Sequence, residues 1–195
     1  MPSKGDKTRE CIKQAAYPLF VERGFKEVAM KDICEVTGLS RGGLYRHFGS
    51  TAELFEEIWR GLVSNTEEDL EQRMRAGHSA RKMLRDILEA RKREMEEKDK
   101  SLTLSVCEYS HAVSSEMFIE LNEKSKIMWG KMIRYGMERG EFAQVDVDAV
   151  VDMILFSYQG ARMWSRILTV DKGVSKHLVD CIWDMLVPDE RRETL

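Results

Sequence analysis

Apolar residues recur at helical spacing along most of the chain. Near its start, five of them share one face through the spacing i, i+3, i+4, i+7, i+8: Ile12, Ala15, Ala16, Leu19 and Phe20. This pattern predicts a first helix that ends at Arg23 and Gly24. Prolines, which break helices, occur only at positions 2, 18 and 188.

Two short helices and a long one are predicted next. The first runs from about Met30 to Val36 and stops at Thr37-Gly38. Ser40 provides an N-cap for a helix over 40–48. Ser50 and Glu53 then form an S-x-x-E capping box, which opens a long fourth helix.

Five further apolar stripes predict the rest of an all-α fold with about nine helices. Their apolar positions lie within 83–88, 102–113, 117–133, 147–158 and 178–186. Asp146 is the predicted cap of the eighth helix. We expect an N-terminal three-helix domain over 1–50 and a C-terminal helical bundle over 51–195, with the helix from residue 50 linking the two.

Charge is unevenly distributed between these two parts. The whole chain has a net charge of -3, yet residues 1–50 hold nine Lys and Arg against six Asp and Glu. A mildly basic first part on an acidic body predicts that only the first part meets a polyanion.

Other features indicate a reducing, intracellular setting. Cys11 and Cys34 fall among apolar helix positions, so we expect buried free thiols. The charged start excludes a secretory signal, and no apolar run is long enough to cross a bilayer. We therefore expect a cytoplasmic protein without a membrane partner, disulfide framework or structural metal site.

The two short helices joined by T-G-L-S match a helix-turn-helix, with the motif at about 29–48. Gly38 supplies the positive φ of the turn, and Leu39 is placed to fill the core between the helices. Leu44 and Phe48 face inward at i, i+4. The outward positions are then Arg41, Gly42, Gly43, Tyr45, Arg46 and His47. Two glycines on this face would let the backbone approach DNA bases; the alternative is that they merely fray a surface helix.

The segment from Thr8 to about Leu62 resembles the DNA-binding domain of the tetracycline-repressor (TetR) family of bacterial regulators. The residues that carry the resemblance are Ala15-Ala16, Leu19-Phe20, Arg23-Gly24-Phe25, Lys31-Asp32-Ile33-Cys34, Thr37-Gly38-Leu39-Ser40, Leu44-Tyr45-Arg46-His47-Phe48, Ser50 and Glu53-Leu54. They cover about a quarter of the chain; beyond them only the helical layout is similar.

The resemblance implies a set of DNA contacts. Base-facing roles fall to Lys31, Arg41, Gly42, Gly43 and Arg46, whereas Ser40, Tyr45, His47 and Thr51 lie where DNA or its phosphates are contacted. This chain departs from the family at three places. Ala29 and Met30 stand where Ser or Thr usually caps the second helix, Thr51 replaces a common Lys, and Gly43 replaces a frequent Thr or Ala. We expect altered specificity rather than loss of DNA binding.

The resemblance also implies a dimer and a small organic effector. Candidate dimer residues are Val150, Ile154, Tyr158, Trp164, Leu178, Ile182 and Met185; the alternative is that they are buried within one chain. Candidate effector-pocket residues are Leu88, Arg91, Val106, Tyr109, Trp129, Met132 and Tyr158, around a molecule expected to be anionic or amphipathic. Alternatively, Arg91 pairs with Glu108 and the aromatic residues are plain core.

The hypothesis that follows is a homodimeric repressor that binds a pseudo-palindromic double-stranded operator and leaves it when the effector binds. It predicts neither enzymatic activity nor a cofactor. A helical-bundle metalloenzyme is a second hypothesis, because Glu108-x-x-His111 beside Cys107 is one element of di-iron bundles; the second such pair is missing from the sequence. A third is a DNA-binding regulator without a small effector.

Overall fold

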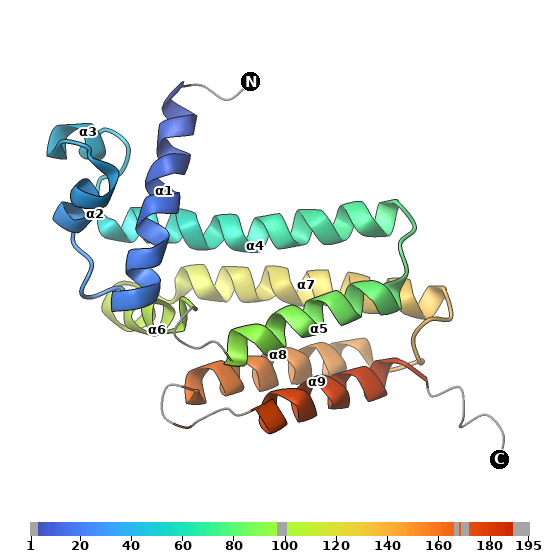
Figure 1. The fold of residues 1–195 in the computed structure, drawn as a ribbon. Coiled ribbons are helices and arrows are strands. Elements are labelled where there is room, and N and C mark those ends of the chain that lie inside the picture. Colours follow the sequence, from blue (N-terminus) through green and yellow to red (C-terminus); the bar gives the residue numbers. More distant parts are fainter. Residues whose placement is uncertain (1–3, 97–100, 166–167, 169–171, 189–195) are drawn as a thin grey trace, which may run out of the picture. The chain divides into compact units, whose positions relative to one another are not determined.

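The computed structural model describes residues 4–96, 101–165, 168 and 172–188. Within these ranges the chain forms helices joined by short connections and no strand, which confirms the predicted all-α class (Figure 1). The helices are α1 (Lys4–Arg23), α2 (Met30–Thr37), α3 (Arg41–Tyr45), α4 (Thr51–Arg75), α5 (Ala80–Glu96), α6 (Thr103–Ala112), α7 (Glu116–Glu138), α8 (Val147–Trp164) and α9 (Lys172–Leu186).

The chain divides into two compact units. The first comprises Met1–Ser64 and Asp99–Leu121, and the second Asn65–Lys98 and Asn122–Leu195. By these bounds, α4 and α7 each contribute to both units. The first unit therefore holds α6 in addition to the three N-terminal helices. The functional division at residue 50 stays a prediction.

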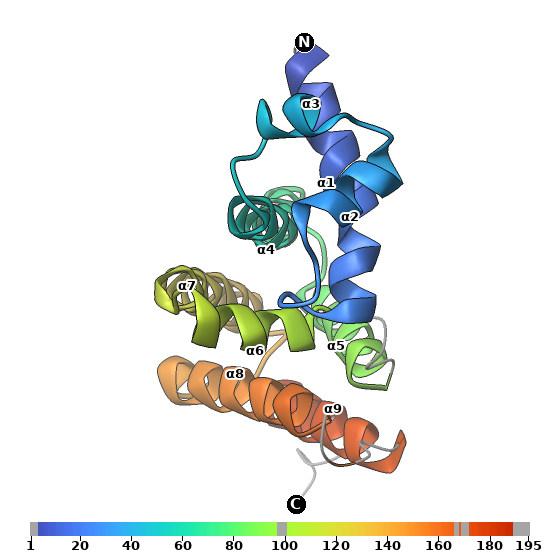
Figure 2. The ribbon, with the colours of Figure 1, turned by 90° about the vertical axis from the view of Figure 1, so that its left-hand side faces the viewer.

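The core of the first unit brings α6 against the N-terminal helices. Figure 2 shows α2 beside α1 and α3, as their contacts require. The ring of Tyr109 on α6 lies 5.1 Å from the ring of Phe25 and 5.2 Å from that of Phe55, measured between centroids. The buried hydroxyl of Ser105 donates to the carbonyl of Phe20 at 2.7 Å, which ties α6 to the end of α1. Aromatic packing of this kind is a large apolar contribution to a small core.

Local capping confirms most of the predicted helix starts. Ser40 Oγ accepts from the N–H of Gly43 at 3.1 Å, and Asp146 Oδ1 from that of Ala149 at 3.2 Å. Ser50 Oγ accepts from Glu53 N–H at 3.1 Å, but the Glu53 carboxylate accepts from Gly49, one residue before the cap, at 2.7 Å. The capping box predicted at Ser50 thus forms in part: the serine bond is as predicted, but Glu53 accepts from the N–H of Gly49 instead of that of Ser50.

The third helix is shorter than predicted. It ends at Tyr45 instead of residue 48, and Arg46 and His47 form a turn. The reason is a tightening of the backbone, because the N–H of His47 bonds to the carbonyl of Leu44, three residues back, at 2.9 Å. Phe48 remains fully buried, as predicted.

The predicted burial of Cys11 is wrong. The side chain is exposed because it lies outside the stripe of Ile12, Ala16 and Phe20 that faces the core of the first unit. Cys34 is half-buried against that core. All four cysteines are free thiols. Among the described residues, no helix combines the length and the apolar character that a membrane crossing requires.

In the second unit, α5, α8 and α9 pack together around a core that includes Leu84, Met132, Ile133 and Leu186. The turn after α7, Arg139-Gly140-Glu141-Phe142, is held by packing. A Cβ on Gly136 would lie only 2.2 Å from the ring of Phe142, so glycine makes room for this ring on α7.

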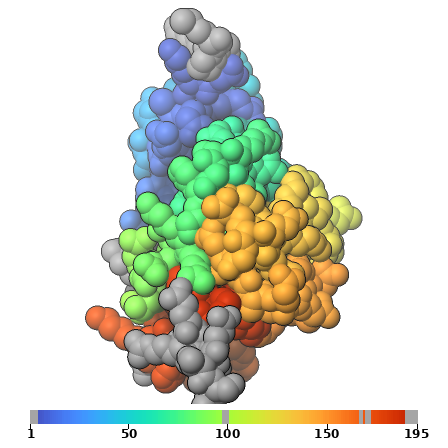
Figure 3. Space-filling model, turned by 90° about the vertical axis from the view of Figure 1, so that its right-hand side faces the viewer, coloured from blue at the N-terminus to red at the C-terminus, as the bar shows by residue number. Residues whose placement is uncertain are grey.

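Glu141 connects the same turn to the start of α5. The Glu141 carboxylate accepts from Ser79 Oγ at 2.6 Å, from Arg81 N–H at 3.1 Å and from Arg139 Nε at 2.6 Å. Figure 3 shows this face of the second unit, with the segment of the turn in orange and α5 in green. Burial by itself raises the pKa of Glu141, but these hydrogen bonds outweigh it and lower the pKa to about 2.

Glu141 is expected to make the protein less stable in acid. The pKa of Glu141 is lower in the folded chain than the value of about 4.3 usual in an unfolded one. Its contribution to the free energy of unfolding is therefore complete above that value and is lost as the pH falls towards 2. In Glu141→Gln this part of the pH dependence should disappear. Urea unfolding between pH 5 and pH 3 tests the prediction. Glu138→Gln, an exposed neighbour, serves as the control, and equal pH profiles for both variants would contradict it.

Candidate nucleic-acid interface

The turn between α2 and α3 has the geometry predicted for a helix-turn-helix. Gly38 adopts a left-handed conformation with φ of +69°, and its N–H bonds to the carbonyl of Cys34 at 2.9 Å. Leu39 packs against the core of the first unit, as predicted. Leu44 is fully buried, so the rotation of α3 about its own axis is defined. The side chains around it point outward.

Most of the predicted DNA-contacting residues lie on this outer surface. Arg41, Gly42, Tyr45 and Arg46 are exposed on and just after α3. Lys31 and Ser40 are also exposed, whereas His47 and Thr51 are half-buried. Two guanidinium groups, a phenol and an imidazole therefore lie beside a five-residue helix.

The two glycines of α3 have different surroundings, which corrects the sequence-based expectation. Gly42 is exposed, and a Cβ there would have no heavy atom within 4 Å. Gly43 is buried instead of outward-facing, because its Cα lies over the cap: a Cβ would be 3.2 Å from Ser40 Oγ. Only Gly42 leaves the outer face of α3 without a side chain, whereas Gly43 makes room for the capping hydroxyl of Ser40.

The start of α2 lacks the side-chain cap that a Ser or Thr hydroxyl would provide. Ala29 has no polar side chain, and the Asp32 carboxylate accepts from its N–H at 2.8 Å. Asp32 also lies 3.6 Å from the guanidinium of Arg23 at the end of α1. Asp32 therefore supplies one half of a capping box, and the other half, which a Ser or Thr hydroxyl at position 29 would supply, is missing.

Arg9 is a residue of this unit that the sequence analysis missed. Its guanidinium donates to the backbone carbonyl of His47, pairs with Glu57 on α4 and lies 4.1 Å over the ring of Phe48. Mutual pairing raises the pKa of Arg9 and lowers that of Glu57. No periodic pattern indicates such a contact, since its partners are 38 and 48 residues away in the chain.

The predicted effector-pocket residues are divided between the two compact units. Val106 and Tyr109 belong to the first compact unit, and Leu88, Arg91, Trp129, Met132 and Tyr158 to the second. Leu88, Trp129 and Met132 are buried in the core of the second unit. Arg91 pairs with Glu94 at 2.9 Å and stacks 5.2 Å from the ring of Tyr158. The alternative partner Glu108 instead accepts from the backbone N–H of Lys26 at 2.9 Å.

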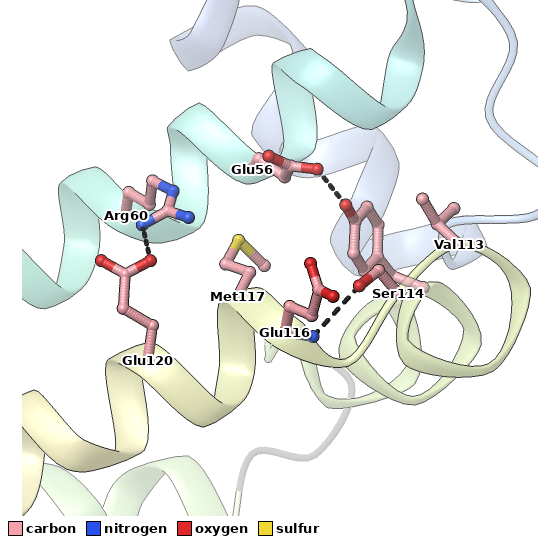
Figure 4. A pocket seen from close by; sticks show the side chains of 8 residues that line it. Glu56, Arg60, Val113, Ser114, Glu116, Met117 and Glu120 are labelled. Atoms are coloured by element: carbon pink, nitrogen blue, oxygen red, sulfur yellow. Dashed lines mark hydrogen bonds and ion pairs between the residues drawn. The ribbon is translucent and has the colours of Figure 1, made fainter.

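Tyr109 lines a cavity of about 420 Å³ in the first unit (Figure 4). The other lining residues are Glu56, Arg60, Val113, Ser114, Glu116, Met117 and Glu120. The hydroxyl of Tyr109 donates to Glu56, and Arg60 pairs with Glu120 at 2.7 Å. Burial and the bond to Glu56 raise the pKa of Tyr109 far above its usual value, so the phenol is a neutral donor. Three carboxylates against one guanidinium make the cavity wall acidic.

The predicted dimer residues are divided between the core and the surface. Val150, Ile154 and Ile182 are 7%, 2% and 7% exposed and belong to the core of the second unit. Leu178, Met185 and Tyr158 are half-buried. Trp164 is 57% exposed, and the pattern missed two exposed neighbours on α8: Phe156 at 71% and Met163 at 46%.

The Glu108-x-x-His111 pair is engaged in local structure. Glu108 Oε2 bonds to the loop before α2 and approaches Gly24 so closely that a Cβ there would lie 2.6 Å away. His111 Nδ1 lies 2.8 Å from the carbonyl of Cys107. In the part of the chain that the structure describes, no three His, Cys, Asp or Glu side chains are grouped as a metal site.

An exposed, cationic α3 behind a glycine-containing turn defines a helix-turn-helix DNA-binding protein. Comparisons with known proteins agree. A family model described as bacterial regulatory proteins, tetR family, matches residues 12–58. The transcriptional repressor KstR2 of Rhodococcus jostii is 26% identical over 170 residues, 84% of this chain and 83% of that protein.

Two solved structures are similar in fold. A TetR-family regulator from Cytophaga hutchinsonii has a TM-score of 0.73 at 19% identity, covering 97% of this chain and 100% of that one. A regulator from Saccharomonospora viridis, in complex with choline, has a TM-score of 0.75 at 20% identity, covering 94% and 99%. Residues 12–58 carry the DNA-binding domain of the TetR family, and the chain is a DNA-binding transcription regulator.

Proposed function

We propose that this regulator is a homodimeric repressor that reads its operator with the outer face of α3 and leaves it when a small molecule binds. The observation that carries the proposal is the outer face itself: Arg41 and Arg46 flank Gly42, where no side chain blocks close approach. The similarity to KstR2, which is named a repressor, supports the direction of regulation.

In this proposal the exposed residues divide into two roles. Arg41 and Arg46 donate to the O6 and N7 edge of guanine, and Lys31 and Gly42 lie towards the bases. Gly43 serves them indirectly, through the cap of α3. Ser40, Tyr45, His47 and Thr51 hold phosphates, and the N-terminus of α4 behind Thr51 adds backbone donors.

The dimer contact is proposed for the exposed side of α8. Phe156, Gly160, Met163 and Trp164 follow helical spacing on this side. A Cβ on Gly160 would have nothing within 4 Å, so a second helix can approach closely there. A two-fold dimer would present two copies of α3 to half-sites about 34–36 Å apart, or a multiple of that.

The effector site is proposed at the acidic cavity beside Tyr109. Glu56, Glu116 and Glu120 outnumber Arg60, which favours a cationic molecule over the anionic one expected from Arg91. The choline complex of the similar structure supports a small organic ligand in this fold. Release from DNA then follows from linkage: an effector that prefers a conformation unsuited to the operator weakens DNA binding by the same factor as DNA weakens effector binding.

Arg41→Ala and His47→Ala should affect DNA binding differently. Loss of a base contact costs about 1–3 kcal/mol and relaxes the preference at one guanine per half-site, whereas loss of a phosphate contact weakens binding to all sequences. Selection of duplexes from a random pool, followed by titration at several salt concentrations, measures both effects. Wild-type affinity should fall steeply with salt. Uniform weakening by Arg41→Ala would place its guanidinium on a phosphate.

Trp164→Glu should produce monomers. Burial of one exposed aromatic side chain from each partner contributes about 3 kcal/mol or more to a dimer, and a buried carboxylate opposes association further. Sedimentation velocity with the full chain tests this. Ile127→Glu provides the control, because Ile127 is similarly exposed but belongs to α7 and not to the proposed contact on α8. A dimer that survives Trp164→Glu but not Ile127→Glu would move the interface to α7.

Binding of organic cations tests the effector site. Choline and benzyltrimethylammonium should bind more tightly than 3,3-dimethylbutan-1-ol, the neutral analogue of choline, and should release the selected duplex. Glu116→Gln should weaken cation binding about tenfold, since it removes one carboxylate from the wall. Glu138→Gln, outside the cavity, should not. Equal affinity for choline and its neutral analogue would contradict the proposed charge preference.

A further inference from the structure

The recognition segment is α3 together with the turn over Arg46 and His47. Its end depends on a side chain from another helix. α3 has only five residues, and the carbonyls at the end of a helix lack partners within it. The turn over Arg46 and His47 leaves the carbonyl of His47 directed towards α1, where the Nη1 of Arg9 donates to it. Arg9 is thus the side chain that closes the end of this segment.

The same guanidinium is held by α4. Its Nη2 pairs with Glu57 Oε2 and lies 3.5 Å from Glu53 Oε1, while its Nε donates to Glu57 Oε1 at 3.4 Å. Lys13 Nζ lies 3.5 Å from Glu57 and supports the pair from α1. A bidentate pair of this kind gives the guanidinium a defined orientation.

Phe48 completes the arrangement. The Arg9 guanidinium lies 4.1 Å above the centre of its fully buried ring. One side chain of α1 therefore contacts both the last residues of the recognition segment and the first turns of α4. α4 is also the helix that continues into the second compact unit, so a shift of its start would move Glu57 and, through Arg9, the carbonyl of His47.

We propose that Arg9 is a positioning residue for DNA binding: together with Glu57 it sets the place of the recognition segment on α4 and does not itself contact DNA. This inference rests on the proposed reading face of α3. The guanidinium spends its Nε, Nη1 and Nη2 donors on protein acceptors, which is the geometry of a structural bridge and not of a free phosphate-binding cation.

The alternative is that Arg9 binds a DNA phosphate. The direction in which Glu57→Ala changes DNA affinity distinguishes this alternative from the positioning role. Glu57→Ala removes a negative charge from the DNA-binding unit and frees Arg9. If Arg9 bound phosphate, this change would strengthen DNA binding. If Arg9 is a positioning residue, the loss of its anchor on α4 weakens DNA binding, against the direction that charge alone gives.

The experiment uses the full chain and the duplex that the wild-type protein selects from a random pool. Arg9→Gln and Glu57→Ala should each weaken binding to that duplex about tenfold, and the double variant no more than either alone, because both break one unit. Arg9→Lys should not rescue binding, since an ammonium cannot hold the carbonyl and the carboxylate in one plane. The slope of log affinity against log salt should stay at the wild-type value.

Control variants isolate charge from position. Lys7→Gln removes a positive charge from an exposed position on α1, and Glu35→Ala removes an exposed carboxylate from α2. Both should change affinity less than the Arg9 and Glu57 variants. All titrations are run well below the thermal unfolding midpoint of each variant. If Arg9→Gln does not fold, the direction of the change in DNA affinity of Glu57→Ala still distinguishes the two roles of Arg9.

Tighter binding by Glu57→Ala, or a salt slope lower by about one in Arg9→Gln, would overturn the inference. So would effects no larger than those of the two controls. If the wild-type protein selects no duplex, that result contradicts the proposed reading face of α3. It is distinct from the results above, which contradict only the positioning role of Arg9.

Discussion

The placement of a helix too short to place itself is the constraint on which this molecule depends. α3 spans five residues, barely more than one turn, and has little stability of its own. Its position comes from its surroundings: Ser40 caps its start, Leu44 and Phe48 anchor its inner side, and Arg9 closes its end. An outer face of so few residues has a defined position only because Arg9 on α1 and Glu57 on α4 hold the end of the segment and buried side chains hold its inner side.

Within the same unit, aromatic packing connects this surface to the proposed effector site. Tyr109 lines the acidic cavity with its hydroxyl and, with its ring, packs against Phe25 and Phe55. Ser105 and Glu108 fasten the same helix to the backbone near the end of α1. An altered position of Tyr109 therefore has a direct physical route to the N-terminal helices. This route needs only contacts within the first compact unit.

Sequence periodicity predicted the helices well and the surfaces less well. The class, the caps at Ser40 and Asp146 and the turn at Gly38 depend on neighbours within a few residues, and these were confirmed. The predicted outward position of Gly43 was wrong: the residue is buried, and a Cβ there would lie 3.2 Å from Ser40 Oγ and 3.9 Å from Leu39. The stripe on α8 was ambiguous: apolar residues occupy two sides of this helix, and periodicity cannot say which side meets its own chain.

By itself, then, the sequence determined the all-α class, the helix-turn-helix and the exposed set around Arg41, since these follow from side chains three or four positions apart. Tertiary structure alone decided that Arg9 meets the carbonyl of His47, that Tyr109 donates to Glu56, and that Phe156 stays on the surface while Ile154 is buried. Each of these depends on how helices pack, and packing joins residues whose distance along the chain carries no periodic signal.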